Sequence, residues 1–217
     1  AVLSATESTC YDELARRARC VAKKNSHARV DRLMGLCMHK GVSMLASIFG
    51  VLYAGCAYVP LVPKHPTARL VVVVSDSGLR CFLLNNSLVT LPKAAIRSVA
   101  RNERITIQGG GGGRSLCYVL FTSGSTGKPK GVLLEHYNLV HFVDSMFARH
   151  HLQPTLRTLA TAAYTFDVHA HNIFETLYAS GQVYVFPKLE MLECISDMVS
   201  SHKIDALQCT PSLVASL

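Results

Sequence analysis

The run from Tyr118 to Val132, YVLFTSGSTGKPKGV, constrains this chain more than any other stretch. Its first part, Tyr118–Phe121, consists of β-branched, aromatic and other apolar residues and predicts a short strand. The small residues of Thr122–Gly127 predict a loop in which backbone N–H groups and hydroxyls can approach an anion closely. Lys128 and Lys130 add fixed positive charge. A strand, a loop of small residues and two lysines together indicate a binding site for a polyphosphate.

Two other interpretations of this run explain less of it. A Walker A loop requires G-x-x-x-x-G-K followed by Ser or Thr, whereas Gly127-Lys128 is followed here by Pro129, and Gly124 lies only three residues before Gly127. A flexible surface linker accounts for the Gly, Ser and Thr content. It does not account for the strand in front, the paired lysines or the apolar residues Val132–Leu134 behind.

The same run resembles the phosphate-loop motif of a known family. TSGSTGKPKG, at Thr122–Gly131, is similar to the pattern T-S-G-S-T-G-x-P-K-G of adenylate-forming enzymes, a superfamily of acyl-CoA synthetases, luciferases and nonribosomal-peptide adenylation domains. The resemblance implies that the loop wraps the β- and γ-phosphates of ATP, with the lysines as countercharge. The implied ATP-binding residues are Thr122, Ser123, Gly124, Ser125, Thr126, Gly127, Lys128 and Lys130.

Further motifs of that family follow in the expected order. Cys10–Leu14 resembles the first core motif, with an aromatic residue two positions before Glu-Leu. Leu52–Arg69 resembles the second, although Val62 stands where an acidic residue is usual, which affects loop packing more than chemistry. His136 and Asn138 match an H-x-N-L pattern after the phosphate loop. We expect His136 to cap a helix or to pack, and not to catalyse.

Hydrophobic periodicity predicts an alternation of helices and strands. Consecutive strand, helix and strand imply a right-handed parallel crossover, so the expected fold class is α/β. The family resemblance implies, more specifically, the N-terminal part of the adenylate-forming enzyme fold, with mostly parallel sheets and flanking helices. Asn85–Arg114, which ends in the glycines 109–113, predicts only a flexible loop. The expected helices are Ser8–Asn25, Gly41–Ala54 with a stop at Gly55, Leu70–Ser77, about 135–148 and Ile173–Ala179; the expected strands are Val30–Met38, Cys56–Pro63, Leu79–Leu84, a strand from Leu159 to Asp167, Val183–Phe186 and a strand from Ile204 towards Pro211.

The second informative stretch is Leu159–Gly181, LATAAYTFDVHAHNIFETLYASG. An Asp at the carboxyl end of a strand, beside a strand-to-helix crossover, lies where open α/β sheets bind ligands. The spacing resembles the family motif F-D-x-S…E-I-F…L-x-x-G, part of the acyl-substrate pocket. In peptide synthetases the Asp after that Phe binds the substrate's α-ammonium group. Carried over by position, Phe166 and Asp167 belong to the site, and Val168 and His171 line the side-chain pocket.

Asp167 favours an amino-acid substrate, because acyl-CoA synthetases and luciferases more often have His at that position. Three departures leave the lining of the pocket open: His169 replaces the common Ser, Asn172 replaces the common Glu, and one extra residue lies between Phe174 and Gly181. Histidines alternating at 169 and 171 on a strand could also suggest a metal. No third ligand is identifiable, so we predict no metal site.

The implied reaction is attack of a carboxylate on the α-phosphate of ATP, which yields an acyl-adenylate and pyrophosphate. Such a step needs positioning and charge neutralisation. Mg²⁺ should accompany the nucleotide, and a phosphopantetheine thiol, on a carrier protein or CoA, should accept the acyl group. In the family, the adenine-binding segment, the magnesium-binding glutamate, the ribose-binding aspartate and a lysine of the mobile C-terminal domain follow Thr210-Pro211. No catalytic residue is therefore identifiable in this chain.

From this we expect residues 1–217 to be a partial adenylation domain, its N-terminal portion, which is inactive alone. The expected partners are a small carboxylate substrate and the C-terminal and carrier domains of a parent chain. Two alternatives stay open: the same portion of an acyl- or aryl-CoA ligase, and a non-catalytic remnant that binds nucleotide or nothing.

Composition narrows the class of protein further. Apolar residues make up 49% of the chain, enough for a packed core, and no apolar run or leader predicts a membrane span or signal peptide. Eight cysteines without C-x-x-C pairs predict reduced, mostly buried thiols and a cytoplasmic location. The net charge of +8 is scattered, without an aromatic-interleaved basic patch, so we expect no nucleic-acid partner.

Overall fold

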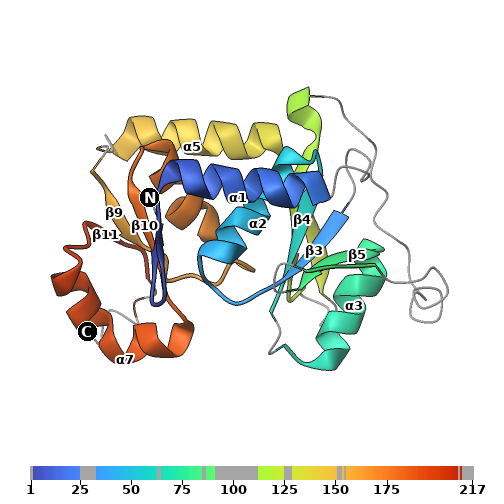
Figure 1. The fold of residues 1–217 in the computed structure, drawn as a ribbon. Coiled ribbons are helices and arrows are strands. Elements are labelled where there is room, and N and C mark those ends of the chain that lie inside the picture. The colour runs from blue at the N-terminus through green and yellow to red at the C-terminus, as the bar shows by residue number, and fades with distance from the viewer. Residues whose placement is uncertain are drawn as a thin grey trace. The chain divides into compact units, whose positions relative to one another are not determined.

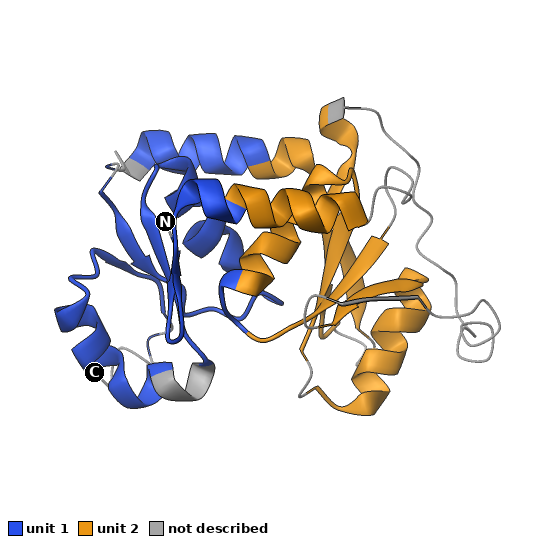
Figure 2. Cartoon of the chain, in the orientation of Figure 1, with its two compact units in different colours: residues 1–14, 40–42, 140–217 blue, residues 15–39, 43–139 orange. Residues whose placement is uncertain are grey.

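The structure is a computed structural model that describes residues 2–24, 33–62, 65–84, 87–90, 112–124, 129–150, 153, 155–209 and 211. Its described part is α/β (Figure 1). The chain divides into two compact units, residues 1–14, 40–42 and 140–217 and residues 15–39 and 43–139 (Figure 2). The boundary falls inside α1 (Tyr11–Lys24), near the start of α2 (Val42–Tyr53) and inside α5 (His136–His150).

The second unit is built on a six-stranded sheet with the order β6-β5-β3-β4-β7-β8. The pairs β3/β4, β3/β5 and β4/β7 are parallel, and antiparallel pairs lie at both edges. Its strands are β3 (Leu33–Cys37), β4 (Ala57–Leu61), β5 (Cys81–Leu84), β6 (Ser87–Thr90), β7 (Leu116–Thr122) and β8 (Lys130–Glu135).

Two crossover helices lie on opposite sides of this sheet (Figure 1). α2 connects β3 to β4, and α3 (Thr67–Ser77) connects β4 to β5. α3 contributes Val73 to a core cluster that also holds Val59 and Phe82. Gly55 and Gly78 follow the two helices with φ of 69° and 64°, a left-handed conformation that glycine adopts without strain. The predicted helix stop at Gly55 is confirmed.

The first unit is built on a five-stranded sheet with the order β11-β9-β10-β1-β2. The pairs β1/β10, β10/β9 and β11/β9 are parallel, and β1/β2 is antiparallel. The helix α7 (Lys188–Ser201) packs on this sheet in one core cluster. Met191 and Ile195 of α7 belong to that cluster with Leu159, Tyr184 and Phe186, which lie in or directly after the strands β9 and β10. The strands are β1 (Val2–Ser4), β2 (Ser8–Thr9), β9 (Arg157–Leu159), β10 (Gln182–Val185) and β11 (Ala206–Leu207).

The predicted fold class, mostly parallel sheets with flanking helices, is confirmed, but several boundaries were wrong. The first helix begins at Tyr11 and not at Ser8, because Ser8–Thr9 pairs with β1 as a strand. The strand predicted from Leu159 to Asp167 ends at Leu159 as β9, and the following residues form turns. β6, inside the stretch expected to be a loop, was missed. Of that stretch, residues 85–86 and 91–111 lie outside the described part of the chain.

The eight cysteines are all free thiols, but only Cys56, Cys81 and Cys117 are buried, so the expectation of mostly buried thiols was wrong. Burial raises the pKa of Cys117 to about 12, which keeps this thiol protonated and unreactive. Among the described residues, no helix is long and apolar enough to cross a membrane.

Candidate functional site

The residues of the phosphate motif lie at the end of a β-hairpin. β7 and β8 are antiparallel, and Thr122, the last residue of β7, pairs with Lys130, the first of β8. The predicted strand before the loop is thus confirmed, and Lys130 proves to be part of a strand. Ser123 and Gly124 follow β7, with Gly124 at a φ of 51°. The predicted Ser125, Thr126, Gly127 and Lys128 lie outside the described residues.

A hydrogen bond from α3 holds the loop end of this hairpin. A guanidinium nitrogen of Arg69 donates to the backbone carbonyl of Phe121, with 3.3 Å between Nη2 and O. The Thr122 hydroxyl faces the carbonyl of Lys130 across the hairpin at 3.5 Å. The side chains of Thr122, Ser123 and Lys130 are all exposed. The strand pair therefore presents the hydroxyl groups of Thr122 and Ser123 and the ammonium group of Lys130 to solvent.

The predicted substrate residues occupy a turn and not the end of a strand. Phe166 and Asp167 lie several residues beyond β9, and Phe166 is 65% exposed. The Asp167 carboxylate is exposed and accepts a hydrogen bond from the N–H of Val168 at 2.9 Å, while its backbone carbonyl accepts from Ala170. Asp167 therefore starts the helical segment that follows, and its carboxylate stays open to a ligand.

His169 belongs to the interior of this turn. It is 1% exposed, and its ring nitrogen Nδ1 lies 2.5 Å from the carbonyl oxygen of Phe166. Burial lowers the pKa of His169 to about 4, against smaller opposing effects of that hydrogen bond and of Asp167. The ring is therefore neutral at pH 7, and because a carbonyl only accepts, Nδ1 carries the proton. The expectation that His169 and His171 alternate on a strand was wrong, since both lie in a helical segment.

Side chains from distant parts of the sequence hold the segment between β9 and the Asp167 turn. The Lys40 ammonium donates to the carbonyls of Ala160 and Thr161, at 2.6 and 2.9 Å. The Asn172 side-chain oxygen accepts from the N–H of Ala162 at 3.4 Å. The Thr161 hydroxyl donates to the carbonyl of Gln208. These contacts hold the backbone of residues 160–162, which lie between β9 and the Asp167 turn.

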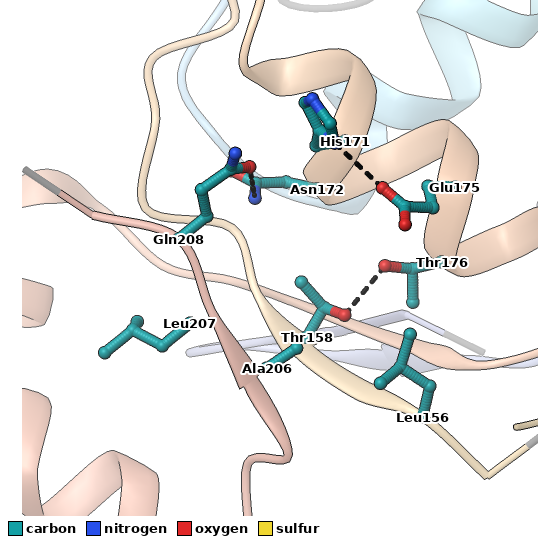
Figure 3. A pocket seen from close by; sticks show the side chains of 9 residues that line it. All are labelled: Leu156, Thr158, His171, Asn172, Glu175, Thr176, Ala206, Leu207 and Gln208. Carbon is teal, nitrogen blue, oxygen red and sulfur yellow. Dashed lines mark hydrogen bonds and ion pairs between the residues drawn. The ribbon is translucent and has the colours of Figure 1, made fainter. Parts of the chain in front are cut away.

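A pocket of about 250 Å³ lies beside this segment, between the helical turn and strands β9 and β11 (Figure 3). Of the predicted substrate residues, His171 lines it, whereas Phe166, Asp167 and Val168 are not among its lining residues. The turn that carries His171 is π-helical, η2 (His171–Glu175), and continues as α6 (Thr176–Tyr178). The lining consists of Leu156, Thr158, His171, Asn172, Glu175, Thr176, Ala206, Leu207 and Gln208.

Six of the lining residues have polar side chains and pair with one another (Figure 3), although the exposed surface of the pocket is mostly apolar. Nδ1 of His171 lies 2.9 Å from Oε2 of Glu175, the Thr176 hydroxyl donates to that of Thr158 at 2.8 Å, and the Asn172 amide reaches Oε1 of Gln208 at 3.5 Å. Sequence reasoning missed Glu175 and Gln208. The i, i+4 spacing of His171 and Glu175 was the only local signal for the first. Gln208 directly follows β11 (Ala206–Leu207), and no local signal could indicate that this distant residue lines the pocket.

The two predicted binding regions fall in different compact units. Thr122–Lys130 belongs to the unit of residues 15–39 and 43–139, and Phe166–His171 belongs to the other. Searched over the part of the chain that the structure describes, His, Cys, Asp and Glu form no group of three or more that could hold a metal ion.

Comparison with known proteins places these features in a family context. A family model described as "AMP-binding enzyme" matches residues 1–217, the whole chain. The zwittermicin A synthase ZmaJ of Bacillus cereus is 29% identical over 227 residues, covering 99% of this chain and 43% of ZmaJ. The nonribosomal peptide synthetase agiA of Aspergillus flavus is 33% identical over 223 residues, covering 94% of this chain and 3% of agiA. The chain thus spans less than half the length of these relatives.

Solved structures show the same fold. The nonribosomal peptide synthetase FmoA3 superposes with a TM-score of 0.81 at 24% identity, over 100% of this chain and 24% of FmoA3. A four-domain nonribosomal peptide synthetase bound to AMP and glycine superposes with a TM-score of 0.78 at 26% identity, over 99% of this chain and 17% of that one.

Proposed function

Because the chain belongs to the AMP-binding enzyme family, we propose that it is the N-terminal part of an adenylation domain that uses ATP to activate an amino acid as its acyl-adenylate. The observation that carries this proposal is the phosphate motif at the end of the β7–β8 hairpin, with Thr122 paired to Lys130. The four-domain relative is bound to AMP and glycine, ligands of the same two classes.

In the proposed reaction, a carboxylate oxygen of the amino acid attacks the α-phosphate of ATP, the bond to the β-phosphate breaks, and pyrophosphate leaves. Ser123, Gly124 and the N–H groups of the loop bind the β- and γ-phosphates, and Lys130 supplies positive charge from β8. The remaining phosphate-binding residues of the proposal are Thr122, Ser125, Thr126, Gly127 and Lys128. Mg²⁺ would neutralise part of the phosphate charge, and we assign it no ligand from this chain.

In this proposal the α-ammonium group of the substrate binds the exposed carboxylate of Asp167. The side chain of the substrate enters the pocket lined by His171. Phe166 and Val168 flank that carboxylate in the turn. A carboxylate beside a cation is the plain electrostatic requirement for holding an amino acid. The acyl group then passes to a phosphopantetheine thiol of a carrier, in the cytoplasm. Since the chain spans less than half of its relatives, we propose that residues outside these 217 complete the catalytic step, which ATP–pyrophosphate exchange would test.

ATP binding is the direct test of the phosphate site. Calorimetric titration of the chain with Mg²⁺ and ATP should give binding, and Lys130→Met should weaken it about tenfold, because a hydrogen bond to a charged group contributes about 1.5 kcal/mol. Lys24→Met is the matched control, since Lys24 is also exposed and lies at the end of α1 in the same unit. Equal affinity of the two variants would contradict the assignment of Lys130.

A further inference from the structure

The polar side chains that line the pocket beside His171 are bonded to one another. They form three pairs within the lining, His171 with Glu175, Thr176 with Thr158 and Asn172 with Gln208. Four of these side chains are also at most 6% exposed: Thr158, Asn172, Glu175 and Thr176. The surface that remains exposed inside the pocket is mostly apolar.

From this lining we propose that the protein binds an amino acid with an apolar side chain of about the size of leucine, and that Leu156, Ala206 and Leu207 supply the apolar contacts. The inference rests on the proposed function, because it assumes that the pocket receives the side chain of the substrate. It adds to that function the chemical class of the amino acid.

The proposed site for the α-ammonium group lies one helical turn from this pocket. The carbonyl of Asp167 accepts a hydrogen bond from the N–H of Ala170 at 2.9 Å, and the carbonyl of Val168 accepts one from the N–H of Asn172 at 3.3 Å. The chain is thus helical from Asp167 onwards, and residues four apart on a helical turn have Cβ atoms about 5–6 Å apart. An amino acid held by Asp167 is therefore close enough for its side chain to enter beside His171.

The partners of the polar groups favour an apolar side chain over a polar or charged one. Apolar groups gain free energy when they leave water for contact with an apolar surface. A carboxamide, carboxylate or ammonium group loses its hydrogen bonds to water on entering a pocket and must find new partners in the protein. Here the His171 ring and the Glu175 carboxylate are already joined at 2.9 Å, and the hydroxyls of Thr158 and Thr176 at 2.8 Å. A polar ligand group would have to share or break these bonds.

The volume of the pocket fits a side chain of this size. About 250 Å³ is the space of roughly eight water molecules at their volume in the liquid, enough for the side chain of leucine. Among the three apolar lining residues, Ala206 has the smallest side chain, so enlarging it is the direct way to reduce this space.

A gap in the packing makes a different prediction. If the pocket only reflected imperfect packing, Ala206→Leu would fill it, would raise the stability of the protein and would leave the binding of amino acids unchanged. Selectivity between two ligands of equal size, together with the effect of filling the pocket, therefore separates the two explanations.

The experiment measures calorimetric binding of L-leucine and L-asparagine to the 217-residue chain in the presence of Mg²⁺ and ATP. Asparagine has a side chain with the branching and nearly the size of that of leucine, but it ends in a carboxamide. Leucine should bind at least about tenfold more tightly than asparagine, because the carboxamide gives up its hydrogen bonds to water.

The matched variants place a leucine inside and outside the pocket. Ala206→Leu should weaken the binding of leucine at least about tenfold, because the added side chain occupies the same space. Its affinity for Mg²⁺ and ATP alone should stay unchanged, which shows that the variant is folded. Ala148→Leu, at an exposed position of α5 in the same unit, should bind leucine as the wild type does.

Equal affinity for leucine and asparagine would overturn the inference while leaving the proposed function in place. The same holds if Ala206→Leu folds and keeps the wild-type affinity for leucine. Should that variant not fold, the comparison of leucine with asparagine on the wild-type chain still decides. If neither amino acid binds, the proposed function fails and the inference fails with it.

Discussion

Lowering the pH from about 7 to about 5 should destabilise the unit that contains His169. The ordinary pKa of a histidine is 6.5, and burial lowers that of His169 to about 4 in the folded chain. Between these two values the unfolded chain binds a proton that the folded chain does not. Stability therefore rises with pH across this window: it is fully present above about 6.5 and is lost as the pH falls towards 4.

The size of this loss follows from the two pKa values. Each pH unit inside the window costs at most about 1.4 kcal/mol. From pH 7 to pH 5 the loss is about 2 kcal/mol, because the unfolded histidine is only partly protonated near pH 6.5. The figure applies to a side chain that is 1% exposed, so solvent screens the charge of the histidine little.

Urea unfolding of the wild type and of His169→Asn, followed by far-UV circular dichroism at both pH values, measures this contribution. The chain contains no tryptophan, which makes dichroism the practical signal. Asparagine can still donate to the Phe166 carbonyl but does not titrate. Carboxylates also titrate near pH 5, so the difference between the two proteins is the informative quantity. His141→Asn, at an exposed position of α5, is the control. An identical pH dependence of wild type and His169→Asn would refute the reasoning.

Three further substitutions test the packing around the site by urea unfolding at pH 7. Gly181→Ala should lower the free energy of unfolding by about 1–3 kcal/mol, because the added Cβ would lie 2.5 Å from the carbonyl oxygen of Leu156. An unchanged urea midpoint would show instead that β10 can shift to make room. Thr158→Val should lower the free energy of unfolding by about 1–2 kcal/mol, because it removes the acceptor of the Thr176 hydroxyl. The double variant with Thr176→Val should regain part of that stability. Additive losses would argue against a coupled pair. Asn138→Ala should lower the free energy of unfolding by about 0.5–1 kcal/mol, because the Asn138 side chain accepts a hydrogen bond from the N–H of Glu135 just before α5. Asn138→Asp, which keeps an acceptor, should lose less.

The sequence predicted best where local chemistry and local structure agree. The apolar run before the phosphate motif forms β7, and the glycine stop at Gly55 ends α2. The family resemblance, read from short motifs, is confirmed over the whole chain. The roles of individual residues, from Ser123 to Asp167, stay predictions.

The long-range contacts could not be predicted from the sequence. Tyr164 and Phe166 are residues that favour strands, and nothing local shows that this segment forms turns instead. The hydrogen bond from Lys40, 120 residues away from Ala160, is one of the contacts that hold it. Gln208 reaches the pocket only because β11 pairs with β9. A buried histidine such as His169 gives no local sign of its burial, so its place in the interior had to come from packing.

The π-helical turn at His171–Glu175 has a consequence for how this protein can change by insertion and deletion. Deleting a residue from an α-helix rotates everything beyond it by about 100°, whereas a π turn, with its i to i+5 hydrogen bonds, can lose one residue and become α-helical. The one extra residue before Gly181 relative to the family motif falls in a stretch that overlaps this turn. Length variation here would alter which side chains face the pocket while both flanking strands keep their register. Under the function proposed above, substrate preference can therefore diverge between relatives through chain length as well as through residue identity.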